Sequence, residues 1–225
     1  MSHISPVKQR LRIHFGKNGP MKYTGNLDIA KTWERVLRRA NLPLLYTEGF
    51  NTRPRIQLAS ALPLGITSEC EIIDVALKEP IELDGLKERL LATSPTGLEI
   101  YRIESVPIDG PALQTLVRSA EYRIEFKEPI DTQALENKIR DMLAQDAIII
   151  ERVKKRKRRE KRIKVDLRPL IHELRMEDEQ TLIAHLSVGD EGNMRPEKLL
   201  ELLGLAESYF TIHRYRLHLA EETKN

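Results

Sequence analysis

Cysteine is nearly absent from this sequence, since Cys70 is the only one among 225 residues. A lone cysteine excludes an internal disulfide framework and a cysteine-based metal cluster built from this chain alone. No run of about 18 apolar residues occurs, so we expect no membrane-spanning helix. The opening segment, MSHISPVKQR, lacks the apolar core of a signal peptide. These absences predict a cytoplasmic protein.

Signatures of common catalytic sites are missing as well. The sequence contains no GxSxG nucleophile elbow, no Walker loop, no GxGxxG turn and no HExxH pair. Cys70 lies in an expected strand, where a buried and inert thiol is the usual outcome. We therefore expect neither a metal nor a cofactor in the chain.

Positive charge is concentrated in one short segment. The formal net charge is only +3, from 37 Lys and Arg against 34 Asp and Glu. Residues 152–164 contain ten basic residues and one acidic residue, and the remainder of the chain holds 27 basic and 33 acidic residues. We therefore expect the positive electrostatic potential of this protein to be concentrated around residues 152–164, while the rest of the chain carries a net negative charge.

Hydrophobic periodicity divides the chain into alternating strands and helices. Leu11, Ile13 and Phe15 recur at period two and predict a strand over 8–15, and Asn26 is the expected cap of a helix over 27–40. The elements expected next are strands 56–62 and 70–77, helix 83–93 and strand 98–106. The turn-rich stretch 107–111 is the expected domain boundary.

The second half repeats the same order of elements. The expected elements are strand 121–126, a helix capped by Asp131 and ending near 144, strands 147–153 and 163–167, a short helix over 168–174, strand 181–188, a helix from Pro196 to Gly204 and strand 209–219. Two successive β-α-β-β-α-β units predict an α+β fold of tandem ferredoxin-like units, 1–107 and 112–220, with a basic hairpin at 152–164 in the second.

The basic run between two expected strands is the first candidate site. Clustered cations attract phosphates and release counterions on binding, so the run predicts contact with a nucleic-acid backbone. The alternatives are a solvated hairpin that only aids solubility, or contact with an anionic protein or ribosome surface. The candidate residues are Lys154, Lys155, Arg156, Lys157, Arg158, Arg159, Lys161 and Arg162.

A second candidate site is the Gly/Asn/Pro loop over 49–55. Its arginines suit an anion or RNA, and Phe50 is available for stacking on a base. The alternative is a structured loop with Phe50 packed into the core. The candidate residues are Arg35, Arg39, Phe50, Asn51, Arg53 and Arg55.

The first half also carries a pattern of motifs that resembles a known family. The segments that carry it are 17–23, 26–28, 33–35, 37–40, 42–44, Tyr46, 49–51, 54–55 and 61–65, with weaker matches at 166–169 and 193–196. They resemble the radical-SAM-linked protein family, a bacterial domain of unknown function that is freestanding or fused behind a radical SAM enzyme. The resemblance implies a radical SAM partner and a setting such as RNA modification.

This chain departs from the family pattern in two places. Gly25 and Asn26 stand where a Ser-His pair is expected, so any role of that histidine is absent, and Thr52 replaces a frequent proline. The chain also has no CxxxCxxC motif and cannot itself hold the iron–sulfur cluster of a radical SAM enzyme.

Three classes of function stay open from the sequence. The first is a non-catalytic RNA-binding or substrate-presenting accessory protein of a radical SAM enzyme. The second is an RNA-processing or RNA-modifying enzyme of tandem ferredoxin-like architecture, with His14 or Tyr23 as the nearby acid or base. The third is a protein-binding scaffold whose basic hairpin meets an acidic partner.

Overall fold

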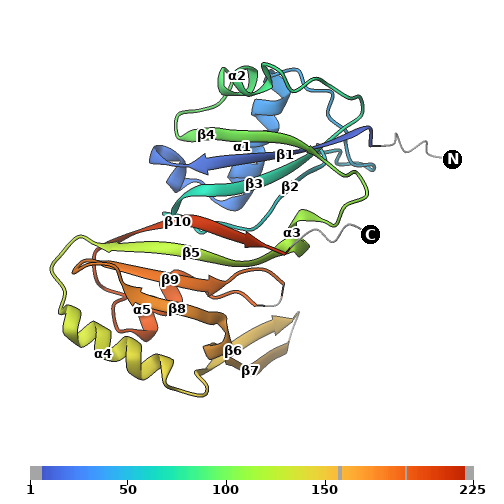
Figure 1. Cartoon of the computed structure of the whole chain (residues 1–225). Coiled ribbons are helices and arrows are strands. Elements are labelled where there is room, and N and C mark those ends of the chain that lie inside the picture. Colours follow the sequence, from blue (N-terminus) through green and yellow to red (C-terminus); the bar gives the residue numbers. More distant parts are fainter. Residues whose placement is uncertain (1–6, 157–158, 191, 221–225) are drawn as a thin grey trace. The chain divides into compact units, whose positions relative to one another are not determined.

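The structure is a computed structural model that describes residues 7–156, 159–190 and 192–220, without the side chains of 154–161. It has an α+β fold with two compact units (Figure 1). The first unit comprises residues 1–118 together with 213–225, and the second comprises 119–212. The segment 107–111, where the sequence predicts the domain boundary, lies within the first unit.

The first unit follows the predicted order of strands and helices. Its elements are β1 (Gln9–Lys17), the 3-10 helix η1 (Gly19–Tyr23), α1 (Asn26–Arg39), β2 (Ile56–Leu58), β3 (Thr67–Leu77), α2 (Leu86–Leu91), β4 (Leu98–Val106) and α3 (Leu113–Leu116). The strands lie in the order β4-β1-β3-β2, and each neighbouring pair is antiparallel. The last strand, β10 (Phe210–Leu219), adds a short parallel pairing, because His213 and Arg214 pair with Thr67 and Ser68 of β3.

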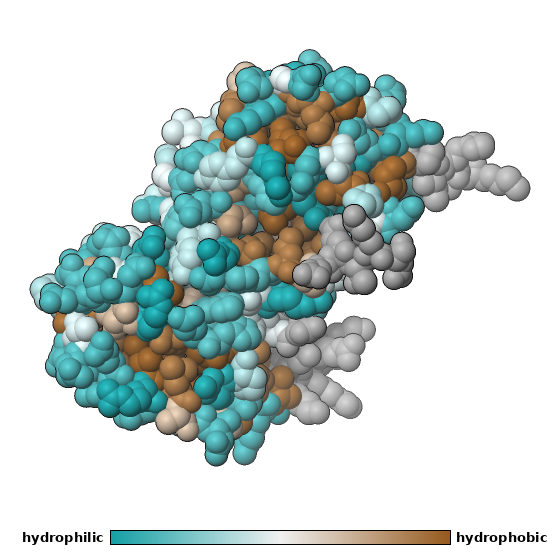
Figure 2. Space-filling model, in the orientation of Figure 1, coloured by the Kyte–Doolittle hydropathy of each residue, from teal (hydrophilic) through white to brown (hydrophobic). Residues whose placement is uncertain are grey.

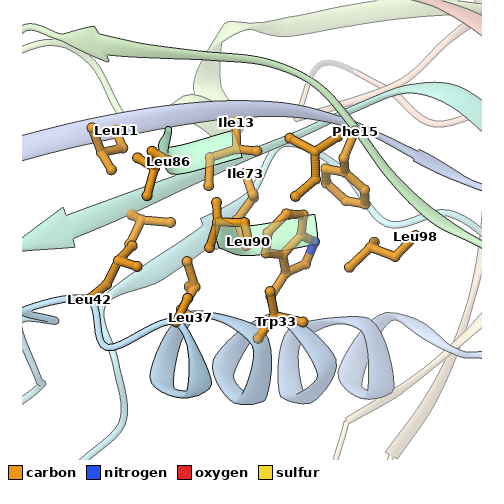
Figure 3. Packing of buried hydrophobic residues seen from close by; sticks show 14 of the residues in the cluster. Leu11, Ile13, Phe15, Trp33, Leu37, Leu42, Ile73, Leu86, Leu90 and Leu98 are labelled. Atoms are coloured by element: carbon orange, nitrogen blue, oxygen red, sulfur yellow. The ribbon is translucent and has the colours of Figure 1, made fainter. Parts of the chain in front are cut away.

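The hydrophobic core of this unit lies between the sheet and its helices (Figure 3). Trp33 of α1 is fully buried and meets Phe15 of β1 edge to face, with ring centroids 5.0 Å apart. Leu37, one turn further along α1, and Leu90 of α2 are also fully buried. The period-two pattern of β1 and the helical pattern of α1 therefore bury their apolar faces against each other.

The start of α1 differs by one position from the expectation. Gly25 is the capping residue and Asn26 is the first helical residue, so the prediction of Asn26 as the cap is wrong. The Asp28 carboxylate accepts a hydrogen bond from the Gly25 backbone N–H at 3.3 Å. This contact satisfies one backbone donor at the helix start in place of an asparagine cap.

The second unit has one sheet and a separate hairpin. Its elements are β5 (Val117–Phe126), α4 (Thr132–Leu143), β6 (Ile149–Arg156), β7 (Arg159–Asp166), the 3-10 helix η2 (Arg168–Leu170), β8 (Ile171–Met176), β9 (Thr181–Ser187) and α5 (Pro196–Leu202). Strands β5, β9 and β8 are antiparallel neighbours, and in the described part of the chain β6 and β7 form a two-stranded sheet. The prediction of Asp131 as a helix cap is confirmed, since its carboxylate accepts from the Ala134 N–H at 2.9 Å.

The helix predicted over 168–174 is wrong. The chain forms only the short turn η2 and then enters strand β8, which pairs with β9. The pairing register with β9 shifts between Ile171 and Glu173, which marks a bulge in β8. Ile171 and Leu174 are both buried although they are three positions apart in the strand. A bulge of this kind gives a strand the three-residue spacing that normally indicates a helix.

The surface in view is mostly hydrophilic, with smaller hydrophobic areas on each unit (Figure 2). Phe50, Leu27 and Tyr23 are among the large hydrophobic residues that solvent reaches. Within the described ranges, no helix combines the length and hydrophobicity that crossing a membrane requires.

Candidate nucleic-acid interface

The basic run forms the hairpin β6–β7, as the sequence predicts. The strands pair without interruption from Ile149 opposite Asp166 to Arg156 opposite Arg159. Cross-strand pairs alternate along the hairpin, so that every second pair belongs to the same set of positions. One set joins 152 with 163, 154 with 161 and 156 with 159, and it holds five basic positions and no acidic one. The register therefore concentrates positive charge in one of the two sets.

Side chains near the base of the hairpin are exposed to solvent. Arg152, Arg162 and Lys164 are all exposed, and the contact of Arg162 with Glu151 is a long one of 3.7 Å. An ion pair of this kind between exposed groups contributes about 0–1 kcal/mol, so it leaves Arg162 available to a ligand. The candidate residues Lys157 and Arg158 lie outside the described residues, as do the side chains of Lys154, Lys155, Arg156, Arg159 and Lys161.

The base of the hairpin is attached firmly to α4. Asp166 accepts hydrogen bonds from the backbone N–H groups of Ile148 and Arg168, at 2.8 and 3.0 Å. The Arg168 guanidinium donates to the Leu143 carbonyl at 3.0 Å, at the end of α4, and to the Ile171 carbonyl at 3.0 Å. A cation at a helix C-terminus also complements the helix dipole. The family-like segment 166–169 thus fixes where the hairpin leaves the unit.

The loop over 46–54 is closed at its base and exposed at its tip. Tyr46 and Pro54 form an isolated β-bridge, and the Thr47 N–H donates to the Arg53 carbonyl at 2.8 Å. Phe50 lies at the tip and its relative exposure is 110%. The alternative in which Phe50 packs into the core is therefore wrong, and the ring is free to stack on a flat partner.

The remaining candidate residues of the first unit are solvent-exposed but come from different elements. Asn51 and Arg53 belong to the same loop as Phe50, and Arg35 and Arg39 lie on α1. Arg55 follows the loop and lines a groove instead. The hairpin residues belong to the second unit.

The groove beside Arg55 was not predicted from the sequence. It has a volume of about 490 Å³, within the range of about 300–1,000 Å³ that is usual for ligand sites. Its walls come from the base of the 46–54 loop, from β2 and β3, and from the segment after β4. The lining residues are Val7, Arg10, Thr47, Pro54, Arg55, Ile56, Gln57, Asp74, Val75, Ala76, Ile108, Gly110 and Ala112.

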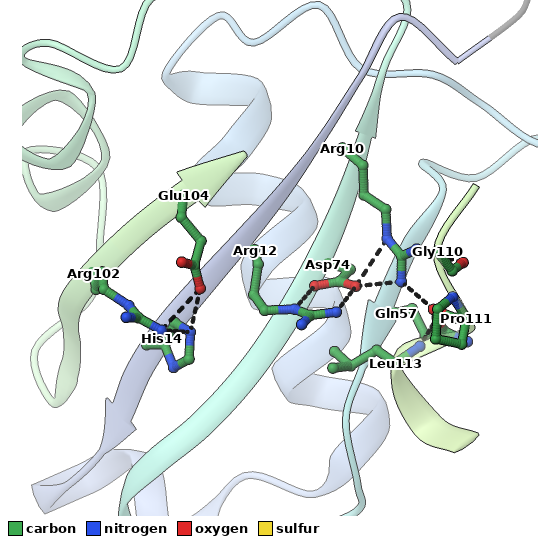
Figure 4. A network of polar contacts seen from close by, with 10 residues as sticks. All are labelled: Arg10, Arg12, His14, Gln57, Asp74, Arg102, Glu104, Gly110, Pro111 and Leu113. Carbon is green, nitrogen blue, oxygen red and sulfur yellow. Dashed lines mark hydrogen bonds and ion pairs between the residues drawn. The ribbon is translucent and has the colours of Figure 1, made fainter. Parts of the chain in front are cut away.

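A buried carboxylate organises the floor of this groove (Figure 4). Asp74, only 4% exposed, accepts from Arg10 at 2.6 Å and from Arg12 at 2.9 Å. Arg10 also donates to the carbonyl groups of Gly110 and Pro111, at 2.9 and 2.8 Å. These bonds satisfy much of the hydrogen-bonding capacity of Arg10, so it serves to hold the segment after β4 rather than to contact a polyanion.

A second polar group on β1 contains His14. Arg102 donates to His14 Nε2 at 2.9 Å and to Glu104 Oε1 at 2.9 Å, and Glu104 lies 3.1 Å from the same ring nitrogen (Figure 4). Burial lowers the pKa of His14 below its ordinary value of 6.5, and the Arg102 charge adds to that effect against the opposing contact with Glu104. Tyr23, the other acid–base candidate, is 69% exposed with the Lys22 ammonium 5.0 Å from its ring centroid.

The described residues contain no group of three or more His, Cys, Asp or Glu placed to hold one metal ion. Burial raises the pKa of the Cys70 thiol to about 12, with the Glu71 charge acting in the same direction. A thiol with so high a pKa is a poor nucleophile at neutral pH.

Sequence reasoning also missed a buried charge cluster on the other side of β3. Glu71 accepts from the guanidinium of Arg214, which is fully buried on β10. Lys17 at the end of β1 is 1% exposed. The available signal was the presence of Glu71 and Asp74 inside the otherwise apolar strand 70–77, where an unpaired carboxylate is costly.

Comparison with known families places the chain in one of them. Residues 10–196 match the family described as uncharacterized proteins conserved in bacteria (DUF2344), and the chain belongs to this family. That description does not mention radical SAM enzymes, so the link to them stays a prediction.

Comparisons with individual proteins add little. No curated protein matches the chain. Among solved structures, a chain from a crystal structure of a Cbf5-Nop10-Gar1 complex is similar at 10% identity and a TM-score of 0.48. The match covers 92% of this chain and 48% of the solved chain, so our chain spans about half of that chain's length.

Removal of the Asp74 carboxylate tests whether its ion pairs with Arg10 and Arg12 stabilise the fold. We expect Asp74→Ala to lower the free energy of unfolding by about 3–5 kcal/mol, because two arginines then lose their buried counter-charge. Glu104→Gln is the matched control, since the Glu104 side chain is 37% exposed and its loss is expected to cost about 1 kcal/mol or less. Urea unfolding measures both, and equal losses in the two variants would contradict the assignment.

The lowered pKa of His14 predicts a pH-dependent stability. The unfolded chain binds this proton near pH 6.5 and the folded chain only at lower pH, so the His14 contribution is fully present above 6.5 and is lost as pH falls below it. We expect His14→Gln to flatten the fall in unfolding free energy between about pH 7 and 5. An unchanged slope, equal to that of an exposed-site control, His172→Gln, would refute the prediction.

Proposed function

We propose that this protein is a non-catalytic RNA-binding or substrate-presenting accessory protein that grips an RNA backbone with the hairpin β6–β7. The observation that carries the proposal is the cross-strand register, which gathers five basic positions and no acidic one in one set. Phosphate contact of this kind supplies affinity without base specificity.

Two further observations support this use of the hairpin. Its base is fixed by Asp166 and Arg168, so the cations leave the unit from a defined point rather than from a loose tail. The rest of the chain is acidic, with 33 acidic against 27 basic residues, and would repel RNA elsewhere. Together they favour RNA binding at the hairpin over unspecific RNA binding across the whole protein surface.

We further propose that the 46–54 loop contributes the second contact. Phe50 is exposed at the tip of a loop whose base is closed by the Tyr46–Pro54 bridge. An exposed ring that is held out by a closed loop is a stacking platform for an unpaired base. Arg53 in the same loop is exposed and adds positive charge to the loop.

The finer fold assignment is also a proposal. We propose that each unit is ferredoxin-like. In the first unit, the sheet order β4-β1-β3-β2 and its antiparallel pairs support this. In the second, β5, α4, β8, β9 and α5 follow the order of the first five ferredoxin-like elements once the hairpin is treated as an insertion between α4 and β8. The sixth element, β10, begins in this unit at Phe210 and continues in the first unit from His213.

The partnership with a radical SAM enzyme rests on the resemblance of the motifs in the first half. Co-expression of the full chain with the radical SAM enzyme of the same organism tests it. Co-purification that survives nuclease treatment supports a direct partnership, whereas loss of the enzyme with the RNA places RNA between the two. Cleavage or modification of RNA by the purified chain alone would instead favour the enzyme class.

Neutralising the hairpin tests the RNA proposal. We expect conversion of Arg152, Lys154, Arg156, Arg159 and Lys161 to Gln to weaken RNA binding. If all five contact phosphates, the slope of log K against log salt becomes shallower by about 3.5 for a single strand, because each contacted phosphate contributes about 0.7. Fluorescence anisotropy with labelled single-stranded RNA at several salt concentrations measures both.

The control neutralises the same number of exposed cations outside the hairpin. These are Lys8, Lys31, Lys78, Arg89 and Lys127. If this control weakens binding as much as the hairpin variant does, net charge explains the binding and the proposal fails. A wild-type chain whose weak binding shows no salt dependence would also end it.

Stacking by Phe50 is tested by changing only that ring. Phe50→Ala is expected to weaken binding of single-stranded RNA by about 1–3 kcal/mol, while Phe50→Trp keeps it, because stacking depends on a flat aromatic face. Leu64→Ala removes another exposed hydrophobic side chain and serves as the control. An equal loss in Phe50→Ala and Leu64→Ala, measured by the same anisotropy titration, would count against the loop contact.

A further inference from the structure

One lysine of the first unit has a buried ammonium group for which the described residues provide no hydrogen-bond acceptor. Lys17 is 1% exposed, and among the described residues its Nζ atom has no hydrogen-bond partner. Burying an ammonium group without an acceptor costs several kcal/mol. A protein that keeps such a group supplies a counter-charge, a bound solvent molecule or a ligand.

The neighbouring carboxylate supplies only part of that counter-charge, because Lys17 shares it with an arginine. Glu71 is the nearby carboxylate, but the Arg214 guanidinium holds it, with Nε at 2.9 Å from Oε1 and Nη2 at 2.5 Å from both oxygens. Arg214 also donates to the Ser60 hydroxyl at 2.9 Å. Lys17, Arg214 and Glu71 therefore hold two positive charges against one negative charge. Burial lowers the pKa of Lys17, the Glu71 charge opposes that shift, and the Arg214 charge adds to it to a smaller extent.

A small cavity lies beside these groups. Lys17, Ser60 and Glu71 line it together with Asn26, the first residue of the 14-residue helix α1, and its volume is about 10 Å³, which is room for about one water-sized group. Asn26 is exposed, so the cavity adjoins the surface at the start of α1. A helix N-terminus carries a partial positive charge and favours anions.

We propose that this Lys17 cavity binds a single anionic atom, either a halide ion or one oxygen of a phosphate group that enters beside Asn26. The excess of one positive charge among Lys17, Arg214 and Glu71 favours a bound anion, because a water molecule would not neutralise it. The amine does not act as a nucleophile on a carbonyl substrate, because the space beside it does not hold one. The site is separate from the hairpin and does not depend on the RNA proposal.

Thermal unfolding of the full chain at constant ionic strength tests the site. Chloride or inorganic phosphate replaces gluconate, the reference anion, whose carboxylate is attached to a bulky polyhydroxy chain. We expect the midpoint of the wild type to rise by about 3–6 °C when the bound anion reaches ten times its dissociation constant. Lys17→Met abolishes the rise, and Lys8→Met, which changes an exposed lysine of the same unit, keeps it. A rise with chloride alone identifies a halide site, and a rise with phosphate identifies a phosphate-oxygen site.

Two results would overturn the proposal. One is a wild-type midpoint that is equal in chloride, phosphate and gluconate, as expected for a cavity that holds water. The other is a rise that persists in Lys17→Met, which places the anion elsewhere. If Lys17→Met does not fold, line broadening of the chloride-35 resonance by the five-residue hairpin variant replaces it. Broadening kept in that variant shows that chloride binds outside the hairpin, as the cavity requires, and broadening lost there assigns chloride to the hairpin and refutes the proposal.

Discussion

Two buried carboxylates on strand β3 set the arrangement of the first unit. Glu71 and Asp74 are three positions apart, so their side chains lie on opposite faces of the sheet. A carboxylate without water is tolerated only when donors satisfy it, and here arginines do so on both faces. Asp74 thereby fixes Arg10 and the segment after β4, while Glu71 fixes Arg214 of β10 against the same strand.

The basic residues discussed above fall into two groups, one that stabilises the fold and one that is exposed to solvent. Arg10, Arg12 and Arg214 are buried or half-buried and are bonded to carboxylates, so they stabilise the fold and are not available to a ligand. Arg152 and Arg162 of the hairpin are exposed, and the long contact of Arg162 with Glu151 lies within the hairpin itself. Formal net charge hides this division, because it counts a neutralised arginine and a solvated one equally.

Much of the first unit was predictable because local patterns and tertiary packing agree there. The alternation of Leu11, Ile13 and Phe15 faces the helical stripe of α1 that contains Trp33 and Leu37, and all five residues are buried. The pattern fails at Ile171 and Leu174, where a bulge in β8 imitates helical spacing. A bulge depends on the partner strand β9, and the sequence of β8 alone does not reveal it.

The sequence by itself determined the order of most elements, the placement of positive charge in 152–164 and the identity of the loop residues around Phe50, because periodicity, charge and turn chemistry are local properties. Only the tertiary structure decided that Phe50 is exposed, that Arg55 lines a groove, and that Lys17 lies near Glu71 and Arg214. Those outcomes depend on contacts between strands that are far apart in the chain. No local pattern encodes the distance between Lys17 on β1 and Arg214 on β10, since only the pairing of both strands with β3 brings them together.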